Sequence, residues 1–84
     1  MYEVEIERTA ERDLSALPRA LFQRIIPHLK SLADNARPPG CHKLAGSKSD
    51  WRIRIGDYRV LYEIDDRRKL VRIFRVRHRR EVYR

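Results

Sequence analysis

The residues whose types and spacing suit chemistry on an anion begin at Arg52. Arg52 and Arg54 stand two apart and alternate with apolar residues, so their guanidinium groups should project from one side of a strand. Arg59 follows the next turn and should join them across a hairpin. A guanidinium offers a planar set of donors that matches phosphate oxygens, and like charges placed together repel unless an anion joins them. The pattern therefore predicts an anion site on this face.

The last eight residues add further chemistry to the same half of the chain. They supply more cations, an imidazole and a phenol, at Arg77, Arg79, Arg80, His78 and Tyr83. A solvated charged tail is the simpler interpretation. It does not explain why an apolar residue and a tyrosine stand near the end, so we treat this segment as a second part of the anion site.

The positive charge is concentrated where these residues lie. Residues 1–51 carry eight Lys/Arg against seven Asp/Glu, whereas residues 52–84 carry twelve against five, and eleven of those twelve are arginine. The net charge of the whole chain is +8. Such asymmetry indicates a polyanionic partner, and we expect a nucleic acid.

Composition excludes several other classes of protein. Eighty-four residues allow one domain, spanning residues 1–84. Three scattered histidines and the single Cys41 fall short of a zinc ligand set, and the glycines match no nucleotide-binding loop, so we expect neither a metal nor a cofactor. The apolar runs are far shorter than the roughly 20 residues of a membrane span. The lone cysteine fits a reducing compartment, so we expect a cytoplasmic protein that does not bind membranes.

The elements that position these residues follow from hydrophobic periodicity. Residues 2–7 alternate as a strand, and Thr9 is placed to cap a short helix. A second helix should carry one apolar stripe, with a kink or broken turn at Pro27. Three strands should follow, over residues 51–55, 58–64 and 70–77. The order β-α-α-β-β-β predicts an α+β fold: a helical hairpin covers one face of a mainly antiparallel three-stranded meander, and the arginines occupy the other face.

Over nearly its whole length the chain resembles the RelE/ParE toxin superfamily. The resemblance rests on the loop at 35–40, on Lys-Leu-Ala-Gly at 43–46, on Gly-Asp-Tyr-Arg-Val at 56–60 and on His-Arg-Arg-Glu-Val-Tyr at 78–83. It implies a RelE-like fold and a toxin of a type II toxin–antitoxin system. RelE-like members cleave mRNA in the ribosomal A site, whereas ParE-like members inhibit DNA gyrase.

The resemblance also implies partners and residue roles. The partners would be an acidic RelB-like antitoxin, the ribosome with its mRNA, and operator DNA reached only through the antitoxin complex. Basic residues of the RelE pattern align with Arg52, Arg54, Arg59 and Arg77, the catalytic tyrosine aligns with Tyr83, and His78 is a competing catalytic group. Well-known members carry lysines at the first two of these positions. Since arginine stays protonated, these two positions should bind phosphate rather than donate protons.

The implied reaction is a metal-independent endoribonuclease step. The RNA 2′-hydroxyl attacks the adjacent phosphate, with Arg59 and Arg77 stabilising the transition state and Arg52, Arg54, Arg79 and Arg80 binding RNA. Tyr83 or His78 takes the proton, and the sequence leaves this choice open. A ParE-like gyrase inhibitor without nuclease activity and a folded but inactive toxin are the alternatives. A free toxin with this net charge should be monomeric.

Overall fold

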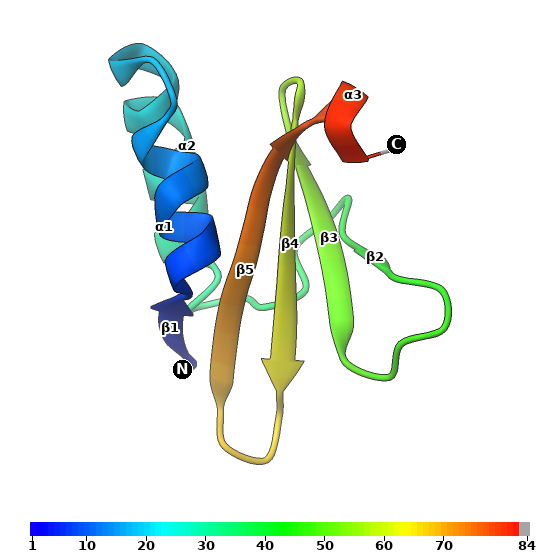
Figure 1. The fold of residues 1–84 in the computed structure, drawn as a ribbon. Helices are drawn as coiled ribbons and strands as arrows, with labels where there is room; N and C mark the ends of the chain where they lie inside the picture. The colour runs from blue at the N-terminus through cyan, green and yellow to red at the C-terminus, as the bar shows by residue number, and fades with distance from the viewer. Residues whose placement is uncertain (83–84) are drawn as a thin grey trace.

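A computed structural model describes residues 1–82 and shows an α+β fold (Figure 1). Figure 1 shows the two longer helices together on one side of the sheet, and the short last helix at the opposite end of the sheet from the β4–β5 turn. Within the described residues, no helix is both long enough and apolar enough to cross a membrane. The elements are β1 (Glu3–Ile6), α1 (Arg8–Ser15), α2 (Arg19–Ser31), β2 (His42–Lys43), β3 (Asp50–Ile55), β4 (Tyr58–Asp65), β5 (Leu70–His78) and α3 (Arg79–Val82).

The strands form one mixed sheet in the order β1-β5-β4-β3-β2. The predicted meander is confirmed, since β3, β4 and β5 pair antiparallel in sequence. The helical hairpin returns the chain so that β1 runs parallel to β5. The two-residue strand β2, which hydrophobic periodicity did not predict, adds an antiparallel edge beside β3. The sheet therefore has five strands.

The core lies between the helices and one face of this sheet. Val60, Tyr62 and Ile64 alternate along β4 and are almost fully buried, as are Ile25 and Leu29 on the apolar stripe of α2. Burying such side chains contributes about 1.5–3 kcal/mol each, which is enough to fix which sheet face turns inward. The residues of β4 that alternate with them, including Arg59, consequently point to the other face.

Two local expectations are wrong. Thr9 does not cap α1, because the carbonyl of Glu7 accepts the first helical bond from Glu11 N–H at 2.9 Å, which makes Glu7 the N-cap residue. The helix does not break at Pro27 either: α2 is continuous from Arg19 to Ser31. Ile25 and Leu29 are buried on either side of Pro27, and this packing offsets the backbone bond that proline cannot donate.

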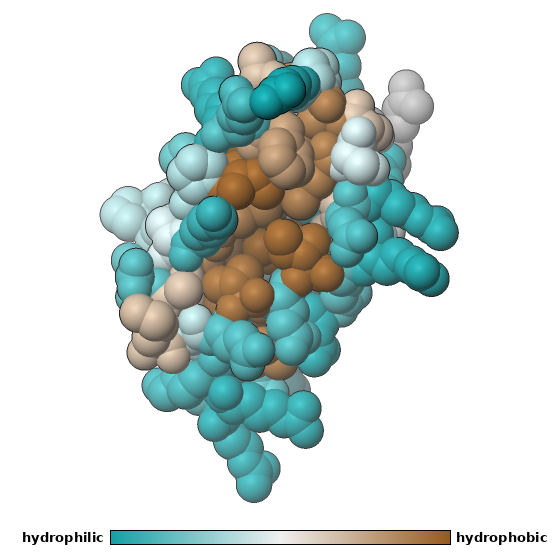
Figure 2. Space-filling model, turned by 90° about the vertical axis from the view of Figure 1, so that its left-hand side faces the viewer, coloured by the Kyte–Doolittle hydropathy of each residue, from teal (hydrophilic) through white to brown (hydrophobic). Residues whose placement is uncertain are grey.

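The side of the molecule that carries α1 and α2 has an apolar centre. Figure 2 shows apolar side chains gathered there and ringed by hydrophilic ones. Phe22 on α2 is 39% exposed, and Ile6 at the end of β1 is 38% exposed.

The loop between α2 and β2 is tied to the sheet by a buried tyrosine. The Tyr62 hydroxyl donates to the carbonyl of Ala36 at 2.9 Å, and both residues are buried. Burial raises the pKa of the Tyr62 phenol, which therefore stays protonated and remains a donor at any ordinary pH. This hydrogen bond therefore fixes the α2–β2 loop to strand β4.

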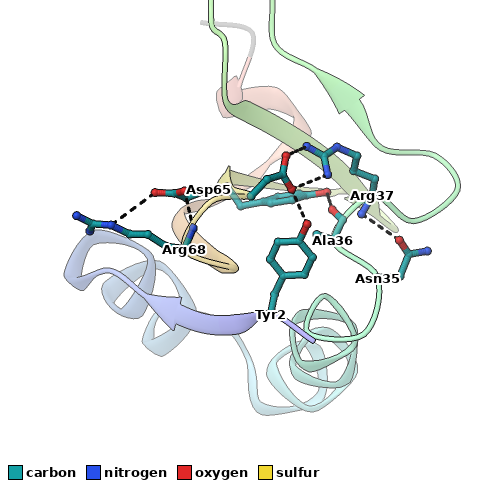
Figure 3. A network of polar contacts seen from close by, with 8 residues as sticks. Tyr2, Asn35, Ala36, Arg37, Asp65 and Arg68 are labelled. Carbon is teal, nitrogen blue, oxygen red and sulfur yellow. Dashed lines mark hydrogen bonds and ion pairs between the residues drawn. The ribbon is translucent and has the colours of Figure 1, made fainter.

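A second anchor holds the same loop to the β4–β5 turn (Figure 3). Arg37 donates from both terminal nitrogens to Asp66, at 2.8 and 3.2 Å, and the Tyr2 hydroxyl donates to the same carboxylate. The Arg37 guanidinium also lies 4.9 Å from the centre of the Trp51 ring. Bidentate arginine–carboxylate pairs are geometrically specific, so this network fixes the path of the chain toward β2.

Candidate nucleic-acid interface

Three arginines form one row across the outer face of the sheet, which the helices do not cover. Arg54 on β3 lies opposite Arg59 on β4, and Arg59 lies opposite Arg77 on β5. Directly opposed residues of an antiparallel sheet share a face, with Cβ atoms about 4.5–5.5 Å apart. The sheet register therefore brings together three cations from three strands. Spacing predicts Arg59 beside Arg54, and the β4–β5 register adds Arg77.

Arg52 extends this row toward the edge strand. It is two residues from Arg54 on the same strand, and it lies opposite His42 of β2. Gly40, His42, Arg52, Arg54 and Arg59 line a concavity of about 330 Å³. We name this the arginine pocket.

The electrostatics of the pocket suit an anion. The Arg54 Nε donates to the carbonyl of Gly56 at 2.9 Å, which turns the side chain toward the β3–β4 turn. The Nη1 of Arg59 is inaccessible to solvent and makes no hydrogen bond to any residue among 1–82. A buried donor without an acceptor is costly, and in the arginine row both strand neighbours of Arg59 are cations. An added anion would relieve this.

Two other arginines of the sheet, Arg72 and Arg75, have carboxylate partners. Arg72 lies 3.0 Å from a Glu63 oxygen and within 3.9 Å of Glu5 and Glu7. Arg75 pairs with Asp13 of α1 at 3.0 Å. Carboxylates thus compensate Arg72 in the lower half of the sheet and Arg75 at the β5 edge, whereas Arg54 and Arg59 lie beside the β3–β4 turn.

His78 does not join the arginine row. It lies opposite Tyr58, which in turn lies opposite Ile55, and this row is on the inner face of the sheet. The imidazole packs edge-on against Tyr58 with ring centres 5.4 Å apart, and its Nδ1 accepts from Arg80 N–H at 3.2 Å. Hydrophobic periodicity ends the last predicted strand at residue 77 and leaves His78 in the terminal segment. β5 continues through His78, and consecutive strand residues point to opposite faces.

The remaining predicted site residues are placed differently. Arg79 and Arg80 are exposed on α3. Together with Asp57 and His78 they line a separate concavity of about 430 Å³, and Arg79 N–H donates to the carbonyl of Asp57 at 2.7 Å. Tyr83 lies outside the described residues. Among residues 1–82 there is no group of three or more side chains that could hold a metal ion.

His42 is the pocket residue that sequence reasoning missed. From the sequence, His42 counts only as one of three scattered histidines. A strand of two residues is too short to show a periodic pattern, so β2 was not predicted. Only the pairing of β2 with β3 places it beside Arg52. Its side chain is exposed.

Known toxins share the sequence pattern of this chain over almost its full length. The family described as the ParE toxin of the type II toxin–antitoxin system parDE matches residues 4–83. Toxin RelG of Mycobacterium tuberculosis is 37% identical over 89 residues, which cover 99% of this chain and 97% of that protein.

Solved structures agree with these sequence relatives. The archaeal RelE–RelB complex of Pyrococcus horikoshii contains a chain with a TM-score of 0.82 and 29% identity, covering 93% of this chain and 94% of that one. The RelBE2 toxin–antitoxin complex of M. tuberculosis gives a TM-score of 0.81 at 31% identity, covering 92% and 96%. The isolated E. coli RelE toxin has a TM-score of 0.80 at 22% identity, covering 99% and 92%, which bears on the fold alone. The chain therefore belongs to the ParE toxin family of type II toxin–antitoxin systems, within the RelE/ParE superfamily that the resemblance predicts.

Proposed function

We propose that this toxin is an mRNA interferase: a ribosome-dependent, metal-independent endoribonuclease that cuts mRNA in the A site. The observation that carries the proposal is the row of Arg54, Arg59 and Arg77, continued by Arg52, on the uncovered face of the sheet. A phosphodiester bound along this row would contact guanidinium donors from three paired strands. RelG and RelE, the names of the relatives above, agree with this activity more than with gyrase inhibition.

In the proposed reaction the RNA supplies its own nucleophile. The 2′-oxygen attacks the adjacent phosphorus, the bond from phosphorus to the 5′-oxygen breaks, and the products are a 2′,3′-cyclic phosphate and a 5′-hydroxyl. Negative charge builds on the phosphoryl oxygens in the transition state, where fixed guanidinium donors stabilise it most. Arg59 and Arg77, in the middle of the sheet, take this role, and Arg52 and Arg54 hold the backbone in line.

Cleavage on programmed ribosomes tests the proposal. The wild-type protein should cut bound mRNA in the A site in the presence of a chelator, and it should leave an mRNA with a 2′-deoxy sugar at the cut position intact. Arg59→Ala should slow single-turnover cleavage by about 10²–10³-fold, the usual worth of one transition-state donor. Arg67→Ala is the matched control, because Arg67 is exposed on the β4–β5 turn at the far end of the sheet.

The salt dependence of RNA binding gives an independent measure. Four phosphate contacts would give a log–log slope of about −2.8 for single-stranded RNA, and loss of Arg59 should reduce its size by about 0.7. An RNA affinity that does not change with salt, or a wild-type protein that blocks gyrase supercoiling and leaves ribosome-bound mRNA uncut, would refute the nuclease.

We further propose that an acidic, RelB-like antitoxin neutralises this toxin and alone contacts operator DNA. Two of the structural relatives above were solved as RelE–RelB or RelBE2 complexes. Supporting features of this chain are its net charge of +8 and the apolar centre on the helical side (Figure 2). Co-expression with a short acidic neighbouring reading frame should yield a complex. The free toxin should behave as a cytoplasmic monomer, measurable by light scattering and cell fractionation.

A further inference from the structure

The arginine pocket is lined by one side chain of a type that serves as a general base. Three of its lining residues are arginines, which remain protonated in proteins, and Gly40 has no side chain. The fifth is His42, and a neutral imidazole nitrogen can accept a proton. Cutting RNA through its 2′-hydroxyl requires such a group, because the attacking oxygen must lose its proton.

The sheet register places the imidazole on the reacting face. His42 lies opposite Arg52 in the β2–β3 pair, so the two side chains leave the sheet on the same side. Arg54 and Arg59 lie opposite each other two residue pairs further along the β3–β4 ladder, on the same face, and complete the pocket. The loop before His42 is anchored by Tyr62 and by the Arg37–Asp66 pair, and this holds the edge strand at a fixed position.

His78, the competing histidine, does not line the arginine pocket and does not lie on the outer face of the sheet. His78 points to the inner face, opposite Tyr58, and its Nδ1 already accepts the backbone N–H of Arg80. By register His78 lies on the opposite sheet face from Arg54, Arg59 and Arg77, although Arg54 also lines a second concavity together with His78 at the β3–β4 turn. Within the arginine pocket itself the imidazole is that of His42.

We propose that His42 is the general base of the cleavage reaction, a role that rests on the nuclease function proposed above. Its neutral imidazole takes the proton of the 2′-hydroxyl while the 2′-oxygen forms its bond to phosphorus. The bond from phosphorus to the 5′-oxygen then breaks, and the leaving oxygen takes a proton from water. Arg52, Arg54 and Arg59 hold the phosphate throughout and exchange no proton. The pocket volume of about 330 Å³ falls within the usual range of ligand sites.

Alanine variants of the full-length toxin, assayed in single turnover on programmed ribosomes, test the assignment. His42→Ala should lose about 10²–10⁴-fold in cleavage rate, the usual worth of an acid–base group. Its affinity for single-stranded RNA should stay within about twofold, because the arginines supply the phosphate contacts. Added imidazole should restore part of the rate, since a small base can occupy the space that the side chain leaves.

A matched control and two rival variants make the result decisive. His28→Ala removes an exposed histidine from α2 and should cleave like wild type. His78→Ala and Tyr83→Phe are the rivals. The assignment is overturned if His42→Ala cleaves within about threefold of wild type, if its loss is matched by lost RNA affinity, or if imidazole restores nothing.

The two proposals fail in different ways. A wild-type toxin that cuts no ribosome-bound mRNA refutes the nuclease, and the role of His42 falls with it. A wild-type toxin that cuts normally, with a loss confined to His78→Ala or Tyr83→Phe, keeps the nuclease and removes His42 as its base.

Discussion

Asp13 joins the helical hairpin to the strand that carries Arg77, and its removal should be costly. One carboxylate oxygen accepts the backbone N–H of Val76 at 2.9 Å, and the same oxygen lies 3.0 Å from Arg75 Nε. Val76 is 3% exposed and the Asp13 side chain 15%, so water does not readily replace these contacts. Asp13→Ala therefore leaves a buried donor without an acceptor and Arg75 without its counter-ion.

The expected cost follows from these two losses. An unsatisfied buried N–H costs about 1–3 kcal/mol. Since the side chain of Arg75 is 31% exposed, the ion pair is worth about 1 kcal/mol. Asp13→Ala should thus lower the free energy of unfolding by about 2–4 kcal/mol, a large part of the roughly 4–13 kcal/mol expected for a chain of this length. Asp13→Asn keeps an oxygen for Val76 but loses the charge and the second oxygen, which accepts from Arg75 Nη2 at 3.3 Å; since Arg75 is partly exposed, this should cost about 1 kcal/mol.

Urea unfolding followed by circular dichroism measures both variants. With a slope of about 1 kcal/mol per M, the midpoint should fall by about 1 M for Asp13→Asn and by about 2–4 M for Asp13→Ala. Arg75→Met should lower the urea midpoint as much as Asp13→Asn does. The double variant Asp13→Asn/Arg75→Met should lower it no further than either single variant. The Val76 amide should exchange with solvent faster only in Asp13→Ala. Equal midpoints for Asp13→Asn and Asp13→Ala would refute the reasoning, because the hydrogen bond from Val76 N–H would then contribute nothing to stability.

Three further predictions concern the anchors and turns that shape the pocket. Tyr62→Phe leaves the buried Ala36 carbonyl without its donor and should lower the free energy of unfolding by about 1–3 kcal/mol, measured by urea unfolding. Hydrogen bonding from Arg37 lowers the pKa of Asp66 to about 2, below its value of about 3.9 in an unfolded chain. The stabilisation by Asp66 should therefore be complete above about pH 4 and lost as the pH falls through about 2; unfolding midpoints of Asp66→Asn and wild type should converge in that window. Gly56 has φ +60° at the β3–β4 turn, so Gly56→Ala should cost about 1–2 kcal/mol in the same assay, and an unchanged midpoint would contradict this.

Local patterns determined the elements of this protein and most of its arginine face. Alternation along 51–55 and 58–64 fixed which side chains share a face, because the period of a strand is two and one face must be buried. Arg52, Arg54 and Arg59 could therefore be grouped by residue spacing alone, and the charge excess after residue 51 indicated an anionic partner. Local rules failed at Thr9 and Pro27, where strand pairing and core packing outweigh propensity.

Tertiary structure decided which residues meet across strands. Arg77 joins Arg59 only through the β4–β5 register, and that register contains a shift between Leu61 and Tyr62 that no sequence period reveals. The same pairing sends His78 to the inner face, where spacing alone had grouped it with the arginines. His42 enters the pocket through a two-residue strand that exists only because β3 offers it an edge. Periodicity is a local property and is written in the sequence, whereas register is the outcome of packing the whole chain, and it is register that builds the pocket.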